Sequence, residues 1–266
     1  MATYKVEGIN VGSFNLGESD KILTIFTAER GLIRAVAKGA RKPGTKVAGR
    51  ADLLNVNSLL IATGRTLDII TQADTLETFP RLRDDLSRLS FGFYYAELSQ
   101  QFGPGLTEES GQYLEYLRQA LRVLSDPGQD AIASCLAFEF GLLAMLGYKP
   151  ELTYCVLCRE ILSDYKLGAF HHEWGGVVCK SCFDDARAAS VAEPGSPWPL
   201  ESTSAREYTH ITPLVWRHLI LAATADPSAF PSKQPLYAAH RLMQSYIEHR
   251  AGRRMKSLDL VKDIRQ

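Results

Sequence analysis

The sequence of 266 residues lacks the features that mark several special classes of protein. It has no uncharged apolar run of about 18 residues, so it predicts no transmembrane helix. Its start contains no apolar segment flanked by basic residues, so it predicts no secretory signal. Internal repeats and low-complexity segments are missing too. Hydrophobic residues at 45% and charged residues at 23% indicate an ordinary globular protein, which we expect in the cytoplasm with no membrane partner.

The sequence also lacks net charge, because 30 Lys and Arg balance 30 Asp and Glu. Taken alone, a neutral total argues against a nucleic-acid binder, since such proteins are usually basic. The charges are unevenly placed, however: the net charge is +5 over residues 1–50, −6 over 51–150, −3 over 151–200 and +4 over 201–266. Electric fields follow the local distribution of charge, so the neutral total does not exclude a basic binding surface.

The common sequence motifs of enzymes are absent. Residues 39–46 come near a phosphate-binding loop, but Thr45 precedes Lys46 where that loop needs Lys before Ser or Thr. A proline also interrupts the loop. Neither a dinucleotide-binding glycine fingerprint nor a nucleophile elbow is found. The sequence therefore predicts a protein that is not an enzyme.

The first 75 residues or so predict five short strands. Alternating or β-branched segments separated by turn residues lie at 5–11, 21–26, 32–37, 53–62 and 67–71. Five strands in this length are typical of a small closed barrel such as an OB-fold. An SH3-like barrel would give much the same pattern, so the strand pattern alone leaves both open.

Helical spacing of apolar residues begins after Phe79 and Pro80. The predicted helices lie at 81–102, 107–124, 130–146, 212–223 and 235–251. Cys135, on the most apolar of them, is expected to be a small buried side chain.

These patterns predict an α+β protein with two domains. Residues 1–80 form the five-stranded barrel, and residues 81–266 form a helical domain. A four-cysteine module at 151–186 is inserted in the helical domain, and a Pro- and Gly-rich linker follows at 190–204.

The strongest motif is a double pair of cysteines. Each pair is separated by two residues, and 20 residues lie between the pairs, which are Cys155 with Cys158 and Cys179 with Cys182. In such a pair, two thiolates of one turn can bind the same ion, and four thiolates complete the tetrahedral coordination shell of zinc. The intervening residues predict a hairpin, as in a zinc ribbon. We therefore predict one zinc ion, structural because four cysteines leave no position for a reacting water.

A catalytic zinc site is a weaker alternative. His171, His172 and Glu173 before Cys179 resemble part of the signature of nucleobase deaminases. No proline precedes Cys179, however, and the spacer is short for that scaffold. The two histidines are expected to be exposed residues of the hairpin.

A basic segment follows the third predicted strand. Between residues 30 and 50 there are seven basic residues and no acidic one. The candidates for binding DNA are Arg34, projecting from a strand, and Lys38, Arg41, Lys42, Lys46 and Arg50 in and after a flexible loop. Such a surface can follow a phosphate backbone. Aromatic residues that could stack on bases are few here: Tyr4, Phe14 and Phe26, with Phe26 expected in the core.

Several of these segments resemble one bacterial family. Residues 17–20 (GESD), 31–42 (GLIRAVAKGARK) and 246–258, with Lys256 and Ser257, are similar to those of the recombination mediator RecO. The resemblance spans nearly the whole chain, and the four cysteines lie where many members carry theirs.

This resemblance implies an N-terminal OB-fold, a helical domain and a zinc-binding element. It implies a protein of the bacterial cytoplasm and nucleoid that binds single- and double-stranded DNA and anneals complementary strands. With RecR, such a protein helps to load RecA onto DNA coated by single-strand-binding protein (SSB), whose C-terminal tail it contacts, in repair and recombination. ATP hydrolysis is not part of this activity. The basic OB-fold surface of the family corresponds to Arg34, Lys38, Arg41, Lys42 and Lys46.

Two other functions remain open on the residues alone. The first is a zinc-containing scaffold for protein interactions, whose basic loop binds an acidic protein tail and not DNA. The second is a zinc hydrolase, which would require a vacant ligand position on the metal.

Overall fold

The computed structural model describes residues 2–192, 208–224 and 233–258, apart from the side chains at 46, 189–192 and 233–235. The chain forms two compact units, one of Met1–Ala131 with Met255–Gln266 and the other of Ile132–Arg254. The α+β class is confirmed. From residue 193 on, the predicted linker at 190–204 lies outside the described residues.

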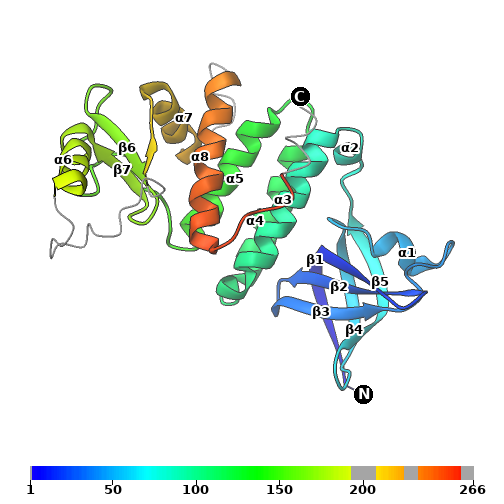
Figure 1. Ribbon diagram of the computed structural model, residues 1–266. Coiled ribbons are helices and arrows are strands. Elements are labelled where there is room, and N and C mark those ends of the chain that lie inside the picture. Colours follow the sequence, from blue (N-terminus) through cyan, green and yellow to red (C-terminus); the bar gives the residue numbers. More distant parts are fainter. Residues whose placement is uncertain (1, 193–207, 225–232, 259–266) are drawn as a thin grey trace. The chain divides into compact units, whose positions relative to one another are not determined.

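The first unit begins with a closed five-stranded barrel (Figure 1). Its strands are β1 (Thr3–Leu16), β2 (Asp20–Thr27), β3 (Gly31–Ala37), β4 (Val56–Ala62) and β5 (Asp68–Glu77). Around the barrel the order is β1-β2-β3-β5-β4, and only the β3–β5 pairing is parallel. A short helix, α1 (Lys46–Arg50), lies between β3 and β4. This order is that of an OB-fold, so the OB-fold prediction is confirmed over the SH3-like alternative.

Alternation along the strands fills the barrel with small and branched side chains. Leu23 and Ile25 of β2 point into the core together with Ala35 and Ala37 of β3. Side chains between these positions point out of the barrel, because successive residues of a strand face opposite sides. The strand pattern thus determines which basic and aromatic residues lie on the outside.

Helices of the same unit follow the barrel directly. They are α2 (Pro80–Arg83), α3 (Leu86–Phe102), the 3-10 turn η1 (Gly103–Leu106) and α4 (Ser110–Ser125). The single helix predicted at 81–102 is divided at Asp85, whose backbone is extended and whose side chain accepts hydrogen bonds from the N–H groups of Ser87 and Arg88. An N-cap of this kind begins a new helix.

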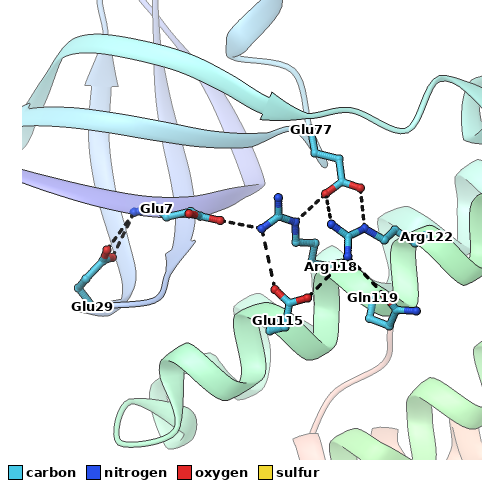
Figure 2. A network of polar contacts seen from close by, with 7 residues as sticks. All are labelled: Glu7, Glu29, Glu77, Glu115, Arg118, Gln119 and Arg122. Atoms are coloured by element: carbon cyan, nitrogen blue, oxygen red, sulfur yellow. Dashed lines mark hydrogen bonds and ion pairs between the residues drawn. The ribbon is translucent and has the colours of Figure 1, made fainter.

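A network of charged side chains joins α4 to the barrel within this unit (Figure 2). Glu77, at the end of β5, accepts two hydrogen bonds from Arg122 at 2.7 and 2.8 Å. It accepts a third from Arg118 at 2.6 Å. Arg118 also donates to Glu7 of β1 at 2.9 Å. Two arginines on successive turns of α4 thus hold one carboxylate of the barrel, and Arg122 does so in the planar two-point geometry that guanidinium groups favour.

Replacing Glu77 with Gln is expected to lower the free energy of unfolding by about 1–2 kcal/mol at pH 7. Hydrogen bonds from Arg122 hold the pKa of Glu77 below its usual range. The stabilisation is therefore complete above the unfolded pKa of about 4.3 and is lost as the pH falls through the lowered pKa. Chemical unfolding followed by circular dichroism should show a difference at pH 7 that shrinks towards pH 3.

Glu115→Gln is the matched control, because the Glu115 side chain is 64% exposed and lies 3.7–3.9 Å from the same arginines. Its effect should be smaller than that of Glu77→Gln. Equal effects of the two variants would contradict this account of the network.

The second unit combines helices with a small sheet. Its helices are α5 (Ala131–Met145), α6 (Lys180–Ala192), α7 (Pro213–Ala223) and α8 (Lys233–Ala251). The sheet has the order β7-β6-β8, with β6 (Leu167–His171), β7 (Gly176–Cys179) and β8 (Tyr208–His210). Thr212 caps α7 by accepting a hydrogen bond from the Val215 N–H. Within the described ranges, no helix is both long and apolar enough to cross a membrane.

Candidate metal centre and nucleic-acid interface

The four predicted metal ligands come together in the second unit. The Sγ atoms of Cys155, Cys158, Cys179 and Cys182 all lie within 4.8 Å of one another. Those of Cys158 and Cys179 are 3.7 Å apart. A tetrahedral zinc ion with Zn–S bonds of about 2.3 Å would separate its sulfurs by about 3.8 Å. The cluster can therefore hold one metal ion with four sulfur ligands.

Backbone geometry explains how the side chains of Cys155 and Cys158 come to face the same metal position. Arg159 has a left-handed backbone with φ 62°, and its N–H donates to the Cys155 carbonyl at 3.0 Å. The Cys155 N–H in turn donates to the Glu160 carbonyl at 2.8 Å. The chain therefore makes a tight turn around Cys155 and Cys158, which points both thiols the same way.

The second pair comes from the end of the β6–β7 hairpin. Cys179 is the last residue of β7, and Cys182 lies in the first turn of α6. The Cys179 N–H donates to the Cys155 sulfur at 3.3 Å, a contact that stabilises a thiolate. Cys155 and Cys179 are buried, whereas Cys158 is exposed. The cluster thus lies at the surface of the unit with two ligands inside.

Cys135 is buried in α5, as expected, and is not one of these four ligands. Its thiol groups with the carboxylate of Glu139 and the ring of His240, all within 4.8 Å. The Glu139 and His240 side chains are 3.2 Å apart. Burial raises the pKa of the Cys135 thiol well above its usual range, so this thiol is neutral at pH 7.

His171 and His172 are not exposed, contrary to prediction: their exposed fractions are 1% and 2%. β8, which pairs with β6 on the side opposite β7, brings Tyr208 against the His171 ring, and Tyr246 and His249 of α8 lie beside the His172 ring. The His172 ring lies 2.9 Å from the Thr209 hydroxyl, and the His171 ring stacks on Trp174 with centroids 3.9 Å apart. Both segments lie far away in sequence, so the local pattern could not show them.

We expect both rings to stay neutral in the folded protein down to about pH 5. Burial lowers the pKa of each to about 4. In the unfolded chain they would take up protons near pH 6.5, so acidification from about 6.5 to 4 should lower the free energy of unfolding. Nitrogen chemical shifts of the two rings, followed by NMR with the metal content checked, test this. Titration of either ring near pH 6.5 would contradict it.

The structure places the predicted basic residues on the barrel and beside it. Arg34 is exposed on β3, and Lys38, Arg41 and Lys42 are exposed in the loop before α1. Lys46 begins α1 and Arg50 ends it, so the loop is shorter than predicted. Arg50 is half-buried and lies 3.8 Å from Asp74. Among the predicted residues whose side chains are described, Arg34, Lys38, Arg41 and Lys42 are thus the exposed ones.

The loop after β3 is tied to the β1–β2 turn, a feature that sequence analysis missed. The Asp20 carboxylate accepts hydrogen bonds from the Gly39 N–H and the Ser19 hydroxyl, both at 2.8 Å. The first of these contacts is the main reason that the pKa of Asp20 is lowered. Arg41 donates from its backbone to the Ser19 carbonyl and from its side chain to the Gly17 carbonyl. The loop is thus held in place, and its lysines remain exposed.

Comparison with known proteins identifies one family over most of the chain. Residues 1–79 match the family model for the N-terminal part of recombination protein O, and residues 83–196 match the model for its C-terminal part. DNA repair protein RecO of Nostoc punctiforme is 40% identical over 207 aligned residues, which cover 74% of this chain and 69% of the relative.

Two other relatives match nearly end to end. DNA repair protein RecO of a Cyanothece species is 34% identical over 98% of this chain and 95% of its own length. The protein of the same name from Gloeobacter violaceus is 32% identical over 98% and 93%. With both family models and these relatives in agreement, the chain belongs to the RecO family.

Proposed function

We propose that this chain is a DNA repair and recombination mediator that binds single- and double-stranded DNA and anneals complementary strands. Membership of the RecO family supports the role in repair and recombination. The observation that carries DNA binding is the exposed basic surface of the OB-fold, formed by Arg34, Lys38, Arg41 and Lys42.

This surface suits a phosphate backbone better than a specific sequence. Its cations lie on a strand and on a loop whose backbone is fixed by Asp20. Cations that neutralise phosphates release counterions, which gives affinity that does not depend on base sequence and falls as salt rises. A protein that anneals strands of any sequence needs binding of this kind.

The cysteine cluster is proposed to hold one zinc ion in a structural role. Four thiolates match the ligand set of structural zinc sites and fill its tetrahedral shell. A zinc hydrolase needs an open position, so we propose that the chain acts without catalysing a reaction of its own. A metal analysis that finds less than about half an ion per folded chain would overturn the zinc assignment.

The partners proposed for this chain follow from the family. They are RecR and the C-terminal tail of SSB, and through them RecA, which is loaded onto SSB-coated DNA. Work on chromosomal DNA would place the protein in the bacterial cytoplasm, with the nucleoid.

A strand-annealing assay tests the proposal. Two complementary oligonucleotides, one labelled with a donor dye and one with an acceptor, are mixed with the protein in the absence of ATP, with and without SSB. We expect faster duplex formation in both conditions. No acceleration, together with no binding to either strand, would instead favour a scaffold whose basic loop binds an acidic protein segment.

A further inference from the structure

An apolar strip crosses the outside of the barrel between two cations. On β2, Leu23 and Ile25 point into the core, so Ile22 points out. On β3, Ala35 and Ala37 point in, so Arg34 and Val36 point out. The outer face of these strands is therefore set by alternation.

Register places an aromatic residue at the end of this strip. Phe14 of β1 pairs with Ile22 of β2, and Ile22 pairs with Val36 of β3. Phe14, Ile22 and Val36 thus form one row across three strands. Phe14 is 57% exposed, whereas Val36 is 9% exposed. The strip is therefore buried at its β3 end and exposed at its β1 end.

Cations border this row on both sides along β3. Arg34 lies two positions before Val36, and Lys38 lies two positions after it; both are exposed. In the row of Lys38 lies Asp20, whose carboxylate already accepts hydrogen bonds from Gly39 and Ser19. A ligand in which apolar and anionic groups alternate, as bases and phosphates do in a nucleic-acid strand, fits such a face.

Phe14 also lies just beyond the part of β1 that α3 covers. At Gly12, two positions earlier, an added Cβ would lie 2.8 Å from the Gln100 side chain of α3. Gln100 also donates to the Val11 carbonyl at 2.7 Å. The helix thus covers β1 up to Gly12, and the exposed ring follows at once.

We propose that Phe14 is a stacking platform for an unpaired base of single-stranded nucleic acid, with Arg34 and Lys38 contacting the flanking phosphates. The inference rests on the proposed DNA binding and names a residue for it. An aromatic ring on the same face as exposed cations is the arrangement with which single-strand binders hold bases without reading sequence. In duplex DNA the bases are already stacked on one another, so the ring would contribute to binding single strands only.

The test compares Phe14→Ala with the unchanged full-length chain on three ligands: a thymidine oligonucleotide, an abasic strand of equal length and a duplex. We expect Phe14→Ala to weaken binding of the thymidine strand by about 5- to 100-fold. Binding of the abasic strand and the duplex should stay within about twofold. The salt dependence should not change, because no cation is removed.

Two control variants keep the result specific. Phe14→Trp should retain binding, because it keeps an aromatic ring. Leu76→Ala removes a side chain of β5 that is 47% exposed and should leave all three affinities unchanged.

Three outcomes would overturn the inference. If the unchanged chain binds none of the ligands, the proposed function fails and the inference with it. If it binds, and Phe14→Ala binds the thymidine strand equally well, the inference alone fails. Equal weakening on thymidine and abasic strands would also overturn it, since the ring would then not act through a base.

Discussion

Cys158→Ser is expected to release the metal from the cysteine cluster and to unfold the module around it. In zinc-finger peptides a structural zinc ion contributes roughly 10–16 kcal/mol, which matches the whole stability of a typical domain, about 5–15 kcal/mol. The turn at Cys155 and the end of β7 meet at this cluster. Losing one of four thiolates should therefore cost several kcal/mol, and without metal the remaining thiols would be left facing one another.

Tryptophan fluorescence reports on this effect, because Trp174 and Trp216 lie in the second unit and residues 1–131 contain no tryptophan. In Cys158→Ser, the fluorescence transition should occur at a much lower denaturant concentration, and metal analysis should find no bound ion. Cys135→Ala is the matched control, since Cys135 is not one of the four clustered ligands, and it should retain the ion. Binding of single strands should suffer less than stability, because the proposed DNA contacts lie on the barrel.

Metal retained in Cys158→Ser, or lost in Cys135→Ala, would contradict the assignment of ligands. Loss of metal without any change in the fluorescence transition would contradict its structural role.

The double charge reversal Arg41→Glu with Lys42→Glu is expected to weaken DNA binding at least tenfold at about 0.1 M salt. Both side chains are exposed in the loop that Asp20 anchors. Each neutralised phosphate of a single strand contributes about −0.7 to the slope of log affinity against log salt. Removing two contacts should make the slope less negative by about 1.4, and the loss should be similar for every base sequence.

Lys5→Glu with Arg65→Glu is the matched control. Both side chains are exposed on the barrel outside the basic segment at 30–50, and the net charge changes by the same amount. This control should lose much less affinity than the loop variant. Equal losses in the two double variants would show that total charge, and not this loop, determines binding.

Much of the fold and the metal cluster could be predicted because the decisive signals are local in sequence. Alternating residues and glycine turns predicted five strands, and the paired cysteines predicted one cluster of four sulfurs. The order of the strands depends on the pairing of β3 with β5, which are distant in sequence. No local pattern could separate the OB-fold from an SH3-like barrel.

Predictions were wrong where a distant segment determines the surroundings or where a local capping residue was overlooked. His171 and His172 follow a hairpin strand and looked exposed, but residues of β8 and α8 lie against them. The helix expected at 81–102 divides at Asp85, because a carboxylate that accepts backbone hydrogen bonds there begins a new helix. The loop described as flexible is fixed by Asp20, whose role depends on the register of β2 with β3.

The placement of charged side chains in the first unit explains how a chain with no net charge can have a basic surface. In the first unit, arginines of α4 are paired with carboxylates of the barrel, as at Glu77. The cations between residues 34 and 42 remain exposed. A chain without net charge can thus present a local surface of one sign.

Equilibrium binding of the unchanged protein to a thymidine oligonucleotide, measured over a series of salt concentrations, tests the central claim most directly. If Arg34, Lys38, Arg41 and Lys42 contact about four phosphates, log affinity should fall against log salt with a slope of roughly −3. The affinity should be similar for strands of other sequences and equal length. Absence of binding at low salt, or an affinity that does not change with salt, would contradict the account.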